Sequence, residues 1–337
     1  MSLMPMVSIL VRIGCWFDNN RIVDGKYRLN YRKKLILRFI SWTTVWCLSL
    51  PVSANSALLP GVIDDVGNTI SLPVPAHRII SLAPHLTELL FAAGAGDYVV
   101  GAVQFSDFPA QANTIPRVGN HSTFDYEVIH ALSPQLIIAW QGGNPGQAIQ
   151  KLRDLGFTIF LSDPKTLEDI PSTIQRLGEL AGTQGKAELS AATFMTQYHE
   201  IQSHYANREP VRVFLEIWNQ PMMTINGKHI INDVITKCGG RNVFSHLDAL
   251  APVVAIEPVL AADPQVIIAS ASEGKRPEWL QDWKQWPQLS ASKYDNLFAV
   301  HADYLHRHTP RLLLGMKKVC EILDTARQRL PVKARAR

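Results

Sequence analysis

Residues 127–140 read EVIHALSPQLIIAW, and residues 257–270 read EPVLAADPQVIIAS. The two stretches match at seven of fourteen positions, including the leading glutamate, the central Pro-Gln and the final Ile-Ile-Ala. Each copy predicts a short helix that starts at the glutamate, a turn at Ser/Asp-Pro-Gln and then a buried strand. A chain that builds this piece twice, 130 residues apart, is predicted to contain a duplicated lobe.

The segments around both copies alternate between predicted strands and predicted helices. Apolar strands are expected at residues 78–83, 98–103, 157–161, 211–218 and 297–300. Strands that are apolar throughout and separated by helices indicate a parallel sheet that is covered on both faces. The predicted fold class is therefore α/β, with two Rossmann-like lobes that each contain a central parallel sheet.

A long helix is predicted between the two lobes, because residues 186–207 contain neither glycine nor proline. A helix of this length resists bending, so we expect a modest movement of the lobes rather than wide closure. The expected domains are an N-terminal extension with a signal peptide (1–54), a short β-like lead-in (55–76), an N-terminal α/β lobe (77–182), a linker helix (183–209) and a C-terminal α/β lobe (210–337).

The net charge of +4 is concentrated in residues 1–54, which hold eight Lys/Arg and two Asp/Glu. The remainder holds 25 basic and 27 acidic residues, which argues against a nucleic-acid-binding surface. Basic residues precede a mostly apolar run at 35–50, and Val52-Ser53-Ala54 follows, as in a secretory signal peptide. The run is short for a membrane span, although an uncleaved anchor is the alternative. Trp46 precedes Cys47 where a lipid-anchor site needs a small residue, so we expect a soluble periplasmic protein.

Four cysteines are present, and Cys15 and Cys47 lie in the segment that we expect to be removed. Cys238 and Cys320 remain as an even pair in an oxidising compartment, which predicts a disulfide. The alternative is two buried free thiols.

The sequence contains none of the common catalytic fingerprints: no GxSxG, GxGxxG, P-loop or HExxH motif is present. His301, His306 and His308 fall near the end of the last predicted strand and could bind a metal, which keeps a periplasmic metal-binding protein or enzyme as an alternative. They have no carboxylate or cysteine at helical spacing, so we expect polar loop residues there instead. The sequence therefore favours a binding protein with no catalytic residues, no bound metal and no cofactor.

Ligands of open parallel sheets bind beyond the carboxyl ends of the strands. Four predicted loops at such ends, residues 105–108, 140–144, 218–223 and 303–307, combine aromatic side chains with polar groups. We read the glycines of the second loop as allowing close approach of a ligand. Flat apolar faces with few polar groups suit a large amphipathic ligand. The candidate ligand-binding residues are Phe105, Asp107, Trp140, Gly142, Gly143, Asn144, Trp218, Met223, Asp303, Tyr304 and Arg307.

Five segments resemble the cobalamin-binding periplasmic proteins of ABC importers: RIISLAPHLTELLFAAG (78–94), FSDFP (105–109), LIIAWQGGN (136–144), KCGGRNVF (237–244) and TPRLLL (309–314). The resemblance extends over about residues 77–328. It implies two α/β lobes joined by one rigid helix, the helical-backbone class III of periplasmic binding proteins, with a disulfide that matches Cys238 and Cys320. It also implies ligand contacts at Phe105, Trp140, Asp303 and Arg307.

The chain departs from this family at several positions. His121 and Ala251 stand where the enterobacterial binder has tryptophan, and Met223 stands where it has phenylalanine. Trp218 and Tyr304 could replace the lost stacking, and His121 could coordinate cobalt. Cobinamide, haem or a ferric siderophore, the last two with Tyr126, Tyr304 or a histidine as ligand, remain alternatives to cobalamin.

The leading glutamates of the two repeated stretches, Glu127 and Glu257, occupy equivalent places in the two predicted lobes. The resemblance implies that they dock against arginines of a homodimeric inner-membrane permease. The alternative is that each acid only favours the N-terminus of its helix. The expected partners are thus cobalamin or a related corrinoid and the permease, with the binding protein itself a monomer.

Overall fold

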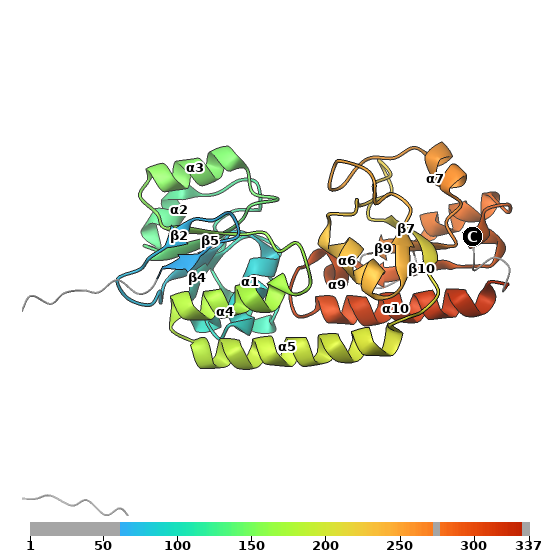
Figure 1. Ribbon diagram of the computed structural model, residues 1–337. Helices are drawn as coiled ribbons and strands as arrows, with labels where there is room; N and C mark the ends of the chain where they lie inside the picture. Colours follow the sequence, from blue (N-terminus) through green and yellow to red (C-terminus); the bar gives the residue numbers. More distant parts are fainter. Residues whose placement is uncertain (1–60, 272–276, 332–337) are drawn as a thin grey trace, which may run out of the picture. The chain divides into compact units, whose positions relative to one another are not determined.

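The computed structural model describes residues 61–271 and 277–331 of the 337-residue chain (Figure 1). The predicted signal peptide, its small-residue end and the cysteines at positions 15 and 47 lie outside the described residues. In the described ranges, no helix combines the length and the apolar character that a membrane crossing requires.

The N-terminal lobe follows the predicted alternation of strands and helices. Its described strands form one parallel sheet in the order β4-β3-β5-β6. Its elements are β3 (Ile79–Ser81), α1 (Pro84–Ala92), η1 (Gly96–Tyr98), β4 (Val99–Ala102), η2 (Ala110–Thr114), α2 (Tyr126–Ala131), β5 (Leu136–Trp140), α3 (Gly146–Asp154), β6 (Ile159–Ser162) and α4 (Asp169–Ala181).

The C-terminal lobe repeats the arrangement, with its described strands in the parallel order β10-β9-β7-β8. Its elements are β7 (Val211–Glu216), α6 (Ile230–Lys237), β8 (Gly240–Asn242), α7 (Ile256–Ala262), β9 (Val266–Ala271), η4 (Glu278–Gln285), α8 (Ser290–Lys293), β10 (Leu297–His301), α9 (Ala302–His306) and α10 (Leu312–Arg329). The short strand β8 was not predicted, because its Gly-Arg-Asn sequence has low β propensity.

The duplicated stretches occupy the same place in both lobes. The first copy forms α2 and β5, and β5 lies between β3 and β6; the second forms α7 and β9, and β9 lies between β7 and β10. Both helices begin one residue before the glutamate. Asp125 caps α2 by accepting a hydrogen bond from the Val128 amide at 3.0 Å, whereas α7 has no side-chain cap at Ala255. The predicted lobe duplication is confirmed.

Successive strand residues point to opposite faces of each sheet, as the pleat requires. In β3, Ile79 packs with α1 and α4, whereas Ile80 packs with α2 and α3. In β7, Val213 packs with α6 and α10, whereas Phe214 packs with the apolar cluster of α7, η4 and α8. Helices therefore cover both faces of each parallel sheet, and this confirms the predicted fold class.

The long helix α5 (Gln184–Tyr205) lies where the linker helix was predicted (Figure 1). It packs against α4 of the first lobe and α10 of the second. Three of its buried side chains, Ala187, Phe194 and Tyr198, belong to an apolar cluster that contains residues of both lobes. The core is thus continuous along this helix.

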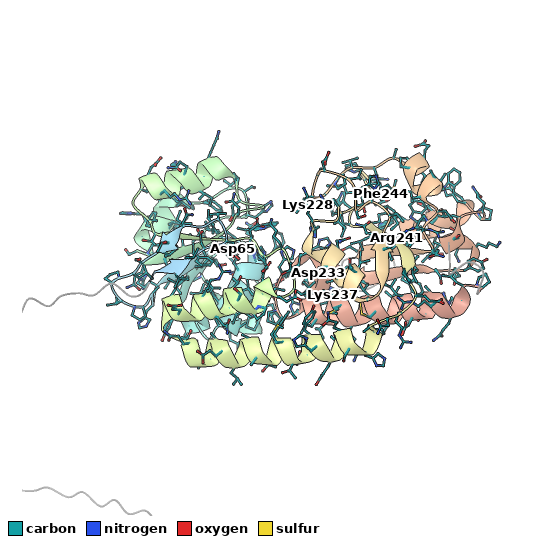
Figure 2. All side chains as sticks on the ribbon, viewed as in Figure 1. Asp65, Lys228, Asp233, Lys237, Arg241 and Phe244 are labelled. Atoms are coloured by element: carbon teal, nitrogen blue, oxygen red, sulfur yellow. A yellow bond between two sulfur atoms is a disulfide. The ribbon has the colours of Figure 1, made fainter. Side chains whose placement is uncertain are left out.

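Contacts near α5 also join the lobes directly. Asp233 and Lys237 both lie on α6 (Figure 2). The Asp233 carboxylate accepts a hydrogen bond from the Leu167 amide at 3.0 Å, and Lys237 lies 3.5 Å from Glu168. The Tyr198 hydroxyl donates to the same glutamate at 2.6 Å. Because α6 belongs to the second lobe and residues 167–168 precede α4 of the first, these bonds fix one side of the lobe boundary.

A small antiparallel hairpin of β1 (Val62–Ile63) and β2 (Thr69–Ile70) precedes the first lobe. Its turn is bonded to the edge strand β6: the Asp65 amide donates to the Leu161 carbonyl at 3.0 Å, and the Asp64 carboxylate accepts from the Leu161 amide at 3.2 Å. Arg176 on α4 also pairs with Asp65. The β-like lead-in is therefore an attachment to the edge of the first sheet.

The predicted disulfide joins Cys238 and Cys320, with an S–S distance of 2.01 Å. Cys238 ends α6 and Cys320 lies within α10, so the bond ties two helices of the second lobe. Both residues are fully buried.

Candidate ligand-binding site

Arg307, which follows α9, donates hydrogen bonds to three carboxylates. Its Nε donates to Asp303 Oδ1 at 3.0 Å, and its Nη1 donates to Asp107 Oδ1 at 2.6 Å and to Glu88 Oε1 at 3.0 Å. Burial alone would lower the pKa of Arg307, but the hydrogen bonds to Asp107 and Glu88 outweigh it and raise that pKa. Burial would likewise raise the pKa of Asp107, yet Arg307 lowers it. Both groups therefore carry their charges at neutral pH.

The structure thus brings together four of the predicted site residues, Asp107, Asp303, Tyr304 and Arg307. Tyr304 is linked to the group by Arg311, which lies 3.7 Å from the Asp303 carboxylate. The Arg311 guanidinium lies 6.0 Å from the centre of the Tyr304 ring and 4.1 Å from that of Phe108. Two arginines, three carboxylates and two aromatic rings consequently meet where α9 faces the loop that follows β4.

Phe105 presents an exposed aromatic side chain in the loop that also carries Asp107. It is 73% exposed and has a positive φ of 65°, a conformation that non-glycine residues rarely adopt. Residues in sparsely populated backbone conformations cluster at functional sites, ligand clamps among them. The position fits the predicted role of Phe105.

The loop after β5 is organised by Asn144 rather than left open for a ligand. Asn144 is buried; its Oδ1 accepts from the Trp140 amide at 2.7 Å, and its Nδ2 donates to the carbonyls of Leu82 and His121 at 2.9 and 2.8 Å. A Cβ on Gly143 would lie 2.0 Å from the ring of Trp140. The glycine therefore makes room for the tryptophan ring. The close approach of a ligand to this loop stays a prediction.

His121 is joined to this loop only through its backbone carbonyl, and the residue is exposed. Trp140 is partly buried and makes an edge contact with the His85 ring, with centroids 5.1 Å apart. The structure therefore groups His121, Trp140, Gly142, Gly143 and Asn144 as one unit of the first lobe.

Trp218 and Met223 form a separate unit of the second lobe. The Met223 amide donates to the Trp218 carbonyl at 2.8 Å, and the Trp218 indole donates to the Gln220 carbonyl at 2.9 Å. Trp218 is 62% exposed. These bonds stay within the loop after β7, so the structure does not tie this pair to the Arg307 group.

A row of histidines that sequence analysis did not connect crosses the lobe boundary. The ring centroids of His85 and His308 are 5.7 Å apart, and those of His308 and His229 are 5.9 Å apart. Burial and, to a smaller extent, the charge of Arg307 lower the pKa of His85 to about 3. Burial and, to a smaller extent, His306 and Lys165 lower the pKa of His229 to about 4. The pKa of His308 is lowered by burial and by the neighbouring histidines. All three rings are neutral at pH 7.

The three histidines considered as metal ligands make other contacts in the structure. His301 Nδ1 accepts from the Asp303 amide at 3.1 Å, His306 Nε2 lies 2.6 Å from Ser270 Oγ, and His308 belongs to the buried row. In the described part of the chain, no group of three or more His, Cys, Asp or Glu residues is arranged to hold a metal ion.

Glu88 and Arg311 are functional candidates that sequence analysis missed. Glu88 is a buried acid on α1, and its carboxylate accepts hydrogen bonds from Arg307, Thr309 and Arg311. The available signal was an acid between apolar positions in Leu-Thr-Glu-Leu-Leu, since an acid is rarely fully buried unless it is paired.

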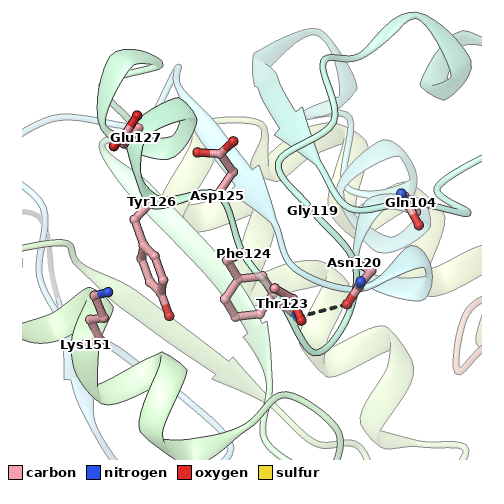
Figure 3. Close-up of a pocket in the computed structure, with 9 residues that line it drawn as sticks. All are labelled: Gln104, Gly119, Asn120, Thr123, Phe124, Asp125, Tyr126, Glu127 and Lys151. Carbon is pink, nitrogen blue, oxygen red and sulfur yellow. Dashed lines mark hydrogen bonds between the residues drawn. The ribbon is translucent and has the colours of Figure 1, made fainter.

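The two docking candidates, Glu127 and Glu257, are both exposed in the first turns of α2 and α7. Glu127 lines an open pocket of about 620 Å³ together with Asp125, Tyr126 and Lys151 (Figure 3). The Lys151 ammonium lies 4.0 Å from the centre of the Tyr126 ring. Tyr126 is thus engaged on α2 and is not part of the Arg307 group.

With two α/β lobes, a connecting helix and a charged and aromatic group between them, the chain has the features of a solute-binding protein. The family model for periplasmic binding proteins matches residues 79–304, and the chain belongs to this family. The fold is that of its helical-backbone class III.

The chain is 39% identical over 260 residues to the vitamin B12-binding protein of Vibrio cholerae serotype O1, covering 77% of this chain and 93% of that protein. The crystal structure of the periplasmic vitamin B12-binding protein BtuF of Vibrio cholerae matches with a TM-score of 0.70 over 75% of this chain and 98% of that one. The apo haem-binding protein RhuT from Roseiflexus sp. RS-1 matches with a TM-score of 0.66 over 74% and 98% at 20% identity, a likeness of fold alone. All three are named as binding proteins.

Proposed function

We propose that this chain captures cobalamin between its two lobes in the periplasm and delivers it to the permease of an inner-membrane ABC importer. The observation that carries this proposal is the 39% identity to a vitamin B12-binding protein over 93% of that protein's length. Residues 1–54 would direct export. The ligand is cargo and not a cofactor, no bond is made or broken, and the carrier acts as a monomer.

The chemistry of the site agrees with such a ligand. A corrin ring offers flat apolar faces and a rim of amide groups. The exposed rings of Phe105 and Trp218 suit the faces, with Trp140 as a further aromatic contact, and the Arg307 group supplies charged donors and acceptors for the amides.

Separate titrations of the purified protein with cyanocobalamin, cobinamide, haemin and zinc test this proposal. We expect saturable binding of cyanocobalamin at submicromolar concentration and no retained zinc. Failure to bind at micromolar cobalamin would refute the proposal. Tighter binding of haemin would favour the haem or ferric-siderophore alternative, and retained zinc would favour a role for His301, His306 and His308.

We propose His121 as a candidate cobalt ligand, because its residue is exposed in the loop region that Asn144 ties to Trp140. Binding of aquocobalamin to the wild-type protein should then shift the absorption bands of the corrin. The His121→Ala variant should bind without this shift. An identical spectrum in both proteins would exclude coordination by His121.

We propose that Glu127 and Glu257 dock the carrier on the permease, one glutamate from each lobe. A permease of two identical subunits has two-fold symmetry, and a duplicated carrier can present the same group to each subunit. Exposed ion pairs contribute little affinity each, so their effect would lie in orientation and encounter rate. Charge reversal at both positions should impair uptake and leave cobalamin binding intact. Reversal of Glu200, exposed on α5, is the matched control.

We propose that the lobes move only modestly on binding. The continuous core along α5 and the bonds from Asp233 and Lys237 to residues 167–168 would all have to change in a wide closure. Small-angle scattering of the free and the loaded protein should therefore give nearly equal radii of gyration. A large decrease on loading would contradict this expectation.

A further inference from the structure

Glu88 connects the two lobes at the candidate ligand site. It lies on α1 of the first lobe, and its side chain is 2% exposed. Its Oε1 accepts from Arg307 Nη1 and Arg311 Nη2, and its Oε2 accepts from Thr309 Oγ1 and Arg311 Nε. All four donors belong to residues 307–311, which follow α9 in the second lobe. A single buried carboxylate thus holds the segment that carries Arg307.

The pairing of Glu88 with Arg311 has the geometry of a fixed anchor. Arg311 donates through both Nε and Nη2, one to each carboxylate oxygen, and such bidentate bonds set the relative orientation of the two groups. A buried charge is tolerated only when it is paired and hydrogen-bonded, and here both oxygens are engaged. Both oxygens of Glu88 are therefore held by donors of the second lobe.

The other two carboxylates around Arg307 are less constrained. The Asp107 side chain is 52% exposed and lies in the loop after Phe105, and the Asp303 side chain is 32% exposed. Arg307 Nη1 is shared between Asp107 and Glu88. When a ligand displaces Asp107, the bond to Glu88 still holds the guanidinium.

One guanidinium nitrogen of Arg307 lacks a carboxylate partner among the described residues. Nε and Nη1 donate to carboxylates, whereas Nη2 does not. An acceptor such as an amide oxygen at the rim of a corrin could bind Nη2 without disturbing Glu88. The direction in which Nη2 points is set by the two bonds of Nη1 and the one of Nε.

We propose that Glu88 is a positioning residue for ligand binding, acting from the first lobe to hold Arg307 of the second lobe at the orientation in which it contacts the ligand. This proposal rests on the proposed function, because the contact that it describes is with the bound corrinoid. It assigns Glu88 a role in affinity that a purely structural ion pair would not have.

The test measures cyanocobalamin binding by calorimetry and its release by stopped flow, for wild type and for E88Q, R307Q and the double variant. We expect E88Q to weaken binding at least tenfold, mainly through faster release, while circular dichroism shows a folded protein. Because Glu88 acts through Arg307, the double variant should bind no more weakly than R307Q alone. Additive losses, or an unchanged dissociation constant in E88Q, would overturn the proposal.

Two further variants separate positioning from stability. D65N removes a largely buried carboxylate of the hairpin whose partner Arg176 lies on α4 of the first lobe, so no bond between the lobes is lost. It should lower the melting temperature and leave affinity within twofold. If E88Q does not fold, E88D keeps the charge but shortens the reach to both arginines, and it should show the same lack of additivity with R307Q. Wild-type protein that does not bind cobalamin would refute the proposed function and this proposal with it. Wild-type binding with unaffected Glu88 variants would refute this proposal alone.

Discussion

Lowering the pH from 7.5 to 5 should weaken the fold through His85 and His229. In the unfolded chain a histidine has a pKa of about 6.5, whereas the folded pKa values are about 3 and about 4. Between these values the unfolded state binds more protons, so the free energy of unfolding decreases as the pH falls below 6.5. The stabilisation is complete above pH 6.5 and is lost as the pH approaches the folded pKa values.

The size of the effect follows from the two shifts. Each pH unit below 6.5 costs about 1.4 kcal/mol for each histidine that stays neutral in the fold. At pH 5 this amounts to about 2 kcal/mol for each residue and about 4 kcal/mol for the pair. The charged groups that face the pair, Arg307 for His85 and Lys165 with His306 for His229, do not supply a carboxylate that would offset the cost.

Urea unfolding at pH 7.5 and 5.0 measures this contribution. The double variant H85L/H229N cannot titrate at these positions, and asparagine can replace His229 as the cap of α6. We expect the pH-dependent change in unfolding free energy to differ from that of wild type by about 4 kcal/mol. H199N, at an exposed position of α5, should behave as wild type. A double variant with the pH dependence of wild type would refute the reasoning.

Three further outcomes are expected. Burial raises the pKa of Glu216 to about 7, so the stability that its neutral form provides is present below pH 4.5 and is lost as the pH rises through 7. In urea unfolding, the free energy of unfolding of E216Q should exceed that of wild type by up to about 3 kcal/mol at pH 8 and match it near pH 4.5. G143A should displace the Trp140 ring, lower the free energy of unfolding by about 1–3 kcal/mol and weaken cobalamin binding in calorimetry. G146A, which places its Cβ in open space, should leave both stability and binding unchanged. Replacing Cys238 and Cys320 by serine opens a loop with a separation of 82 residues and should cost about 4 kcal/mol in thermal unfolding, leaving ligand affinity unchanged.

The fold could be predicted because its signals are local and repeated. Short apolar runs bounded by turn residues, such as residues 136–139, favour buried strands of a covered sheet, and a second copy of the same run indicates the second lobe. The disulfide was predicted from the two cysteines that lie outside the predicted signal peptide and its N-terminal extension. The strand β8 escaped prediction because its pairing with β7, and not its composition, makes it a strand.

The candidate site could be predicted only in part. Asp107, Asp303 and Arg307 were found because each follows a predicted strand. Glu88 was missed because its partners lie more than 200 residues away, and a single sequence does not show which distant charges meet. The packing of Gly143 against Trp140 could not be predicted for a similar reason, since the ring that covers this glycine is placed by tertiary packing.

The hairpin at residues 62–70 has a consequence for how the protein stays in solution. A strand at the edge of a sheet has unpaired backbone N–H and C=O groups that can pair with a strand of another molecule, and β6 is an edge strand. Because both backbone groups of Leu161 are already bonded to the turn of the hairpin, this part of the edge is closed to a second molecule. A shortened protein that begins at Arg78 would keep every described strand of the two parallel sheets but lose the hairpin that covers this edge. We therefore expect the shortened protein to associate with itself while it still binds its ligand.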